Sequence, residues 1–178
     1  MTPEEAATAL TTVPGALDDT VAELPGAPGL VAWWAAPEVL PALGGAAHPG
    51  SGLRLLDLGA ATMLRNRVRR QDLYRTGVSR LRRVVAGLLL DDLGLAPTWA
   101  ADVILPKADE SRLTPWMAER LLLTWVADDD RAALLPAVAR LVGPTGLDGE
   151  AAAQAESRFT AAAGEKTPRE VGVPFQRP

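Results

Sequence analysis

Short apolar runs, each the length of one buried strand, constrain the fold of this chain most. The runs GLVAWWAA and LRLLDLGA cover residues 29–36 and 53–60. Apolar runs of this length, bounded by glycine and proline, are typical of buried strands, although the carboxylate Asp57 interrupts the second run. LLLTWVA alternates as a strand does, and TWAADVILP predicts a further strand. We therefore expect a small sheet in which Trp33 and Trp34 point to opposite faces.

Segments with helix signals surround the predicted strands. Capping residues, acidic first turns and terminal glycines mark their ends. The predicted helices begin at Thr2, near Leu17, at Thr62, at Ser79, at Thr114 and after the acidic run 128–130, and an alanine-rich helix precedes a loose C-terminal tail. The helix that starts at Ser79 is expected to stop at Gly94. Strands and helices mixed in this order predict an α+β domain with helices packed around the sheet.

Composition excludes several classes of protein and site. The 178 residues suit one ordinary domain, and they include no cysteine and a single histidine, His48. Thiolate and histidine-rich metal sites are therefore excluded, and we predict no metal and no cofactor. No apolar run approaches the roughly 20 residues of a membrane span, and the acidic start does not resemble a signal peptide. We expect a cytoplasmic protein without a membrane partner.

Basic charge is concentrated in one part of an acidic chain. Residues 65–83 contain eight arginines and one acid, Asp72, whereas the whole chain carries a net charge of −4. This concentration favours a local anion site, and a solvated helix face paired with acids elsewhere is the alternative. Sixteen arginines against two lysines also indicate a compositional bias that inflates the arginine count.

Four segments together resemble a known family. PGLVAWWA, LRLLDLGAATMLRNRV, TGVSRLRRVVAGLLL and LTPWMAERLLLTWVA occur in the order and spacing seen in the GIY-YIG nuclease-like proteins of actinobacteria. The resemblance implies a small, mainly antiparallel sheet flanked by helices over residues 28–144. Residues 1–27 would then form an N-terminal helical extension, and residues 145–178 a C-terminal helix and tail.

The residues that the family uses for cleavage are mostly replaced. In that family a tyrosine helps to activate water, an arginine steadies the phosphate and a glutamate holds a divalent cation. Residues 29–31 read GLV and residues 57–59 read DLG, so valine and aspartate stand where tyrosines are expected. Arg67 matches the family's arginine, but the glutamate position falls near Leu134. We therefore expect a degenerate member without metal-dependent nuclease activity.

The retained arginines and the new carboxylate define the predicted site. Asp57 and Arg67 are the candidate catalytic residues, with Asp57 acting as a general base or a cation-orienting group, or else forming a salt bridge to Arg67 or Arg65. Arginine binds phosphate, sulfate and carboxylate through two hydrogen bonds, and a helix start offers free N–H groups. The candidate ligand-binding residues are Arg65, Ser79, Arg82, Trp34, His48 and Glu119.

Three functions follow from this interpretation. The first is an enzyme, or an enzyme subunit, of specialised metabolism that binds an anionic small molecule in the arginine-lined pocket. The second is a non-catalytic nucleic-acid-binding module, which the overall acidity disfavours. The third is a regulatory protein whose terminal extensions contact a protein partner, and a divergent nuclease is a further alternative.

Overall fold

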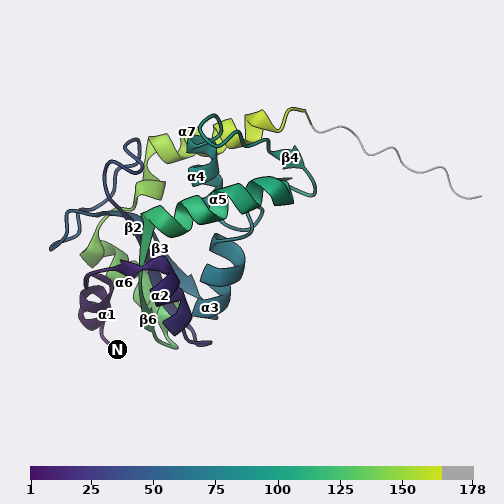
Figure 1. Ribbon diagram of the computed structural model, residues 1–178. Helices are drawn as coiled ribbons and strands as arrows, with labels where there is room; N and C mark the ends of the chain where they lie inside the picture. Colours follow the sequence, from purple (N-terminus) through teal and green to yellow (C-terminus); the bar gives the residue numbers. More distant parts are fainter. Residues whose placement is uncertain (166–178) are drawn as a thin grey trace, which may run out of the picture.

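A four-stranded antiparallel sheet forms the centre of the computed structural model, which describes residues 1–165 (Figure 1). Its strands lie in the order β1–β6–β2–β3, which places β3 at one edge. A separate hairpin pairs β4 with β5. The strand bounds are β1 Gly15–Ala16, β2 Gly29–Ala35, β3 Arg54–Ala61, β4 Thr98–Trp99, β5 Val103–Ile104 and β6 Leu121–Ala127. The predicted α+β class and the strands β2, β3 and β6 are therefore confirmed.

Helices cover both faces of the sheet (Figure 1). The α-helices are α1 Pro3–Leu10, α2 Leu17–Glu23, α3 Leu64–Asn66, α4 Arg80–Leu88, α5 Lys107–Arg120, α6 Arg131–Val142 and α7 Glu150–Ala162. A π-helical segment, η1 Arg67–Asp72, continues α3, and a short 3₁₀ turn, η2 Gly146–Asp148, precedes α7. Within the described residues, no helix combines the length and the apolar character needed to cross a bilayer.

Two hydrophobic clusters occupy opposite faces of the sheet, as the paired tryptophans predict. Trp33 belongs to the cluster beneath α4, α5 and α7, and Trp34 belongs to the one beneath α1 and α6. Both indoles are buried. Leu17, near the N-terminus, and Phe159, near the C-terminus, pack into the Trp33 cluster. The flanking helices therefore share the core of the sheet.

A register shift in β3 places its single acid on the Trp33 face. Trp33 pairs with Asp57 and Trp34 pairs with Leu55, so Leu56 is an extra residue between the two pairs. A bulge of this kind re-aims the side chains beside it. Cross-strand partners share one face of a sheet, so Asp57 lies on the side covered by α4.

Several predicted helix ends are wrong. Thr62 caps nothing, because the helix after β3 starts at Leu64 and the chain changes at Arg67 to the wider π-helical winding. Thr114 lies inside α5, where its hydroxyl donates to the carbonyls of Leu73 and Glu110. The Ser79 cap is confirmed, since its Oγ accepts from the Arg82 N–H.

The remaining differences concern the ends of two further segments. The helix α4 ends at Leu88, well before Gly94, because the chain leaves it through a turn. The predicted strand in TWAADVILP forms two short strands that pair with each other outside the main sheet. The alanine-rich helix is present as α7, whereas the predicted loose tail lies mostly in residues 166–178, outside the described residues.

Candidate anion site at the edge of the sheet

A cavity of about 570 Å³ opens at the outer edge of β3, next to Asp57 and Leu58. Asp57 and Leu58 both line it, and because neighbouring strand residues point to opposite faces, the cavity follows the strand edge. The other walls come from the start of η1, the start of α4, and the stretch from α6 to η2; they are formed by Arg67, Arg80, Leu135, Ala139, Arg140, Gly143, Pro144, Thr145, Leu147 and Asp148. Elements distant in sequence thus converge on Asp57.

A buried carboxylate fixes Arg67 in this cavity. Arg67 Nε donates to Asp72 Oδ1 and Oδ2 at 3.1 and 2.9 Å, and Ser79 Oγ donates to Asp72 Oδ1 at 2.8 Å. Asp72 has no exposed surface. Burial lowers the pKa of Arg67, but the charge and hydrogen bonds of Asp72 outweigh it and leave that pKa above its ordinary value. The guanidinium is therefore held in place and charged.

The free end of Arg67 reaches Asp57. Arg67 Nη2 lies 3.6 Å from Asp57 Oδ2, and both Nη1 and Nη2 lie beside Gly59. Asp57 therefore forms the ion pair that was one of its two alternatives, and the partner is Arg67. Because Asp72 uses only Nε, the terminal N–H groups keep hydrogens for a ligand in the cavity.

Burial also changes the acidity of Asp57. Its side chain is only 16% exposed, and the loss of water raises its pKa to about 6, although the nearby Arg67 charge acts in the opposite direction. A carboxyl group with such a pKa can exchange a proton near neutral pH. The site therefore combines a fixed cation with a titratable acid.

Replacing Asp57 with asparagine is expected to stabilise the protein at pH 8 but not at pH 4. The native pKa of about 6 exceeds the ordinary value of 3.8, so ionisation costs more in the folded state, and this cost appears as pH rises from 3.8 to 6. The free energy of unfolding of Asp57→Asn, relative to that of the natural protein, should thus increase by about 1–3 kcal/mol between pH 4 and pH 8. Urea unfolding of both proteins at several pH values measures it, and parallel pH profiles would contradict it.

Two further arginines give the cavity an excess of positive charge. Arg80 Nε donates to Glu156 of α7 at 3.1 Å, which leaves its terminal nitrogens for other partners. Arg140, at the end of α6, makes no ion pair within the described part of the chain. The Asp148 carboxylate is occupied by Thr145, whose N–H and hydroxyl donate to it. Such a set of guanidinium groups suits an oxyanion.

Arg82 and Arg65, two predicted ligand-binding arginines, lie outside this cavity. Arg82 is completely buried and binds Glu110 through Nε at 2.6 Å, with Nη2 donating to Thr114. Arg65 Nε donates to the Leu24 carbonyl and so ties α3 to the end of α2. Ser79 contributes indirectly, because it is buried and holds Asp72.

The other three predicted ligand-binding residues also lie elsewhere. Trp34 is buried on the opposite face, where its Nε1 donates to Thr124. His48 packs edge-on against Trp34 with 4.9 Å between ring centroids, and its Nε2 lies 2.9 Å from the Thr12 carbonyl oxygen. Glu119 is exposed and pairs with Arg120. The Trp34–His48 pair therefore joins the N-terminal segment to the long loop after β2.

Sequence reasoning missed Asp72, Arg80 and Arg140. Asp72 carried a signal, since it is the only acid among eight arginines in residues 65–83. Arg80 lies next to the predicted Ser79, whereas Arg140 is far along the chain and only the packing of α6 brings it to the cavity. Among the described residues, no cluster of three or more acidic or histidine side chains could hold a metal ion.

Comparisons with protein-family models, with curated proteins and with solved structures found no match to this chain.

Proposed function

We propose that this protein is a degenerate relative of the GIY-YIG nucleases that binds a small anionic molecule at the edge of β3, as an enzyme or an enzyme subunit. The observation that carries the proposal is the fixed Arg67 guanidinium. Asp72 holds its Nε, and its terminal nitrogens, one of which also pairs with Asp57, lie at a cavity that Arg80 and Arg140 also line. Three guanidinium groups around one cavity favour a phosphate, sulfate or carboxylate group.

The relative positions of the family's residues support the nuclease ancestry. Val31, at the place of one tyrosine, pairs with Gly59, and Asp57, at the place of the other, lies two residues away on the same strand face. Arg67, at the place of the arginine, lies beside both Asp57 and Gly59. The resemblance implies one site for these positions, and they do lie together.

The side chains present argue against metal-dependent cleavage in this proposal. Valine carries no proton to exchange, and Leu134, where the glutamate falls, is buried in the cluster on the Trp34 face. Leu135 and Ala139 are the α6 side chains that line the cavity beside Arg140, and neither can bind a cation. An anion bound at Arg67 would thus be held without the ion that offsets developing charge in a nuclease.

Asp57 narrows the class of ligand in this proposal. An ionised carboxylate repels an anion, so the preferred ligand carries a hydrogen-bond donor, such as a hydroxyl or ammonium group, next to its anionic group. That donor would face Asp57 while the anionic group faces the arginines. With its pKa near 6, Asp57 could also take a proton from the donor as a general base.

Inorganic phosphate is the simplest ligand with which to test the anion site. Phosphate should raise the thermal unfolding temperature more in the natural protein than in Arg67→Gln, because site binding adds to the general stabilisation by phosphate that both proteins share. Arg67→Gln should weaken phosphate binding about 10- to 100-fold, since it removes charge-assisted hydrogen bonds. Calorimetric titration measures the affinity.

Arg158 supplies the matched control for the phosphate titration. It is an exposed arginine of α7 that pairs with Asp91 and does not line the cavity. Arg158→Gln therefore removes the same charge from a distant place and should leave the affinity unchanged. If Arg67→Gln and Arg158→Gln lost the same phosphate affinity, net charge alone would explain the loss, and the proposed site would be wrong.

Nucleic-acid binding is the second candidate function, and one surface favours it. Arg65, Asn66, Arg69, Arg70 and Tyr74 line a small cavity of about 370 Å³ along α3 and η1. Basic side chains beside an aromatic ring are typical of surfaces that bind single strands. A salt-dependent gel shift with single- and double-stranded DNA tests this candidate, and the absence of a shift at low salt would reject it.

A further inference from the structure

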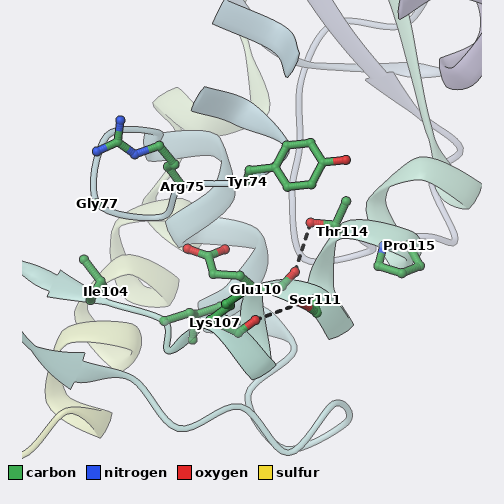
Figure 2. A pocket seen from close by; sticks show the side chains of 10 residues that line it. Tyr74, Arg75, Gly77, Ile104, Lys107, Glu110, Ser111, Thr114 and Pro115 are labelled. Atoms are coloured by element: carbon green, nitrogen blue, oxygen red, sulfur yellow. Dashed lines mark hydrogen bonds between the residues drawn. The ribbon is translucent and has the colours of Figure 1, made fainter. Parts of the chain in front are cut away.

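A second large cavity lies between the segment that links η1 to α4 and the helix α5. Its volume is about 620 Å³, within the usual range for small-molecule sites. Figure 2 shows the Tyr74 ring on one side and α5 on the other, with Ile104 and Pro115 at opposite ends. None of its lining residues lines the anion site described above. The two cavities therefore have separate linings.

The polar groups at the floor of this second cavity already have partners. Glu110 accepts hydrogen bonds from the N–H and the hydroxyl of Thr76 and from Arg82 Nε. The Thr114 hydroxyl donates to the Leu73 carbonyl at 2.6 Å and accepts from Arg82 Nη2. Arg82 neutralises the charge of Glu110, so the floor of the cavity does not attract a cation. The polar atoms of Glu110 and Thr114 also have hydrogen-bond partners within the protein. A ligand would therefore meet chiefly carbon surfaces there.

Those carbon surfaces are two aliphatic side chains at the end of β5 and directly after it, together with the ring of Tyr74. Ile104 and Leu105 form one wall, and Pro115 lies at the other end. Tyr74 is 57% exposed although it is a large aromatic residue. An exposed aromatic ring at the edge of an apolar cavity is a feature of ligand sites, because it gains buried area when a flat molecule packs on it.

The rim of the cavity carries cations without an ion-pair partner. Arg75 and Lys107 both line the cavity and are exposed, and neither makes a salt bridge within residues 1–165. Because the floor is neutral, these two charges set the sign of the potential at the entrance. An anionic group there would be attracted, and a cationic ligand would be repelled.

We propose that this cavity binds a flat, ring-bearing organic anion, such as an aromatic carboxylate or sulfonate. The ring system would pack on Tyr74 and against the end of the cavity formed by Ile104 and Leu105, and the anionic group would lie at the rim near Arg75 and Lys107. Burial of apolar area would supply most of the affinity for the ring system, and the two cations would favour a ligand with a negative charge.

A pair of dyes that share a ring system tests both parts of this proposal. 8-Anilinonaphthalene-1-sulfonate carries the sulfonate, and N-phenyl-1-naphthylamine is the same molecule without it. Both become fluorescent in an apolar site, so titration gives an affinity for each. We expect the double variant Arg75→Gln/Lys107→Gln to weaken the sulfonate dye about five- to tenfold, since two exposed charge contacts are lost, and the neutral dye less than twofold.

Tyr74 locates the bound dye, because it is the only tyrosine in the chain. Protein grown with 3-fluorotyrosine should therefore give a single fluorine resonance. The sulfonate dye is expected to shift this resonance with a midpoint equal to the affinity from fluorescence. Ile104→Glu should weaken both dyes, because it places a charge in the wall, while Arg158→Gln, on the surface of α7, should change neither.

Three results would overturn the proposal. If the sulfonate dye became fluorescent on binding but did not shift the fluorine resonance of Tyr74, the dye would bind elsewhere. If the double variant lost the same affinity for both dyes, Arg75 and Lys107 would not select for the anionic group. A shift of the resonance by single-stranded DNA but not by the dye would assign this surface to nucleic acid. Unchanged urea midpoints of the variants show that they remain folded during the titrations.

Discussion

Replacing Arg82 with alanine is expected to lower the free energy of unfolding by about 3–5 kcal/mol. Arg82 is completely buried, and its partner Glu110 is only 15% exposed, so the variant leaves a carboxylate in the interior without its cation. The guanidinium also donates to the Glu110 carbonyl and the Thr114 hydroxyl, which lose these bonds. Urea unfolding, monitored by tryptophan fluorescence, measures the loss.

Arg83 provides the control for Arg82, because it is the next residue of the same helix. Its side chain is 26% exposed and pairs with Glu156, so Arg83→Ala should cost about 1 kcal/mol or less. The double variant Arg82→Met/Glu110→Met removes both buried charges together and should be more stable than Arg82→Ala. Similar losses for Arg82→Ala and Arg83→Ala would show that burial of the ion pair does not decide the effect.

The contrast between Arg82 and Arg67 shows what the sequence could and could not predict about the site. Both are arginines in predicted helices, and each has a carboxylate partner. The partner of Arg67 lies five residues away, whereas Glu110 lies 28 residues beyond Arg82 on another helix. Spacing along the chain cannot tell which arginine turns inward, so Asp57 and Arg67 were predicted to lie together, while Arg82 was assigned to the ligand.

Local signals predicted the strands better than the ends of the helices. The strands β2, β3 and β6 follow from continuous or alternating apolar runs, and these strands make up most of the sheet. Thr114 and Pro115 read as a helix start, yet Thr114 turns its hydroxyl to the Leu73 carbonyl inside α5. Tertiary hydrogen bonds therefore override a cap signal, and no feature of the sequence reveals them.

The close approach of α4 and α7 leads to the second large effect. A Cβ added at Gly87 would lie 2.0 Å from the Ala155 carbonyl oxygen, which is part of the α7 backbone and cannot rotate away. Gly87→Ala should therefore lower the free energy of unfolding by about 3 kcal/mol, despite the better helix propensity of alanine. Gly26→Ala, where nothing lies within 4 Å, should be neutral or slightly stabilising.

The same variant tests whether α7 supports the anion site. Glu156 of α7 accepts hydrogen bonds from Arg80 and Arg83, and Arg80 lines the cavity at the edge of β3. If Gly87→Ala pushes α7 away from α4, Arg80 loses its anchor while Arg67 keeps Asp72. The phosphate affinity of Gly87→Ala should then fall, but by less than that of Arg67→Gln. Unchanged unfolding and unchanged phosphate affinity in Gly87→Ala would contradict the close packing of these two helices.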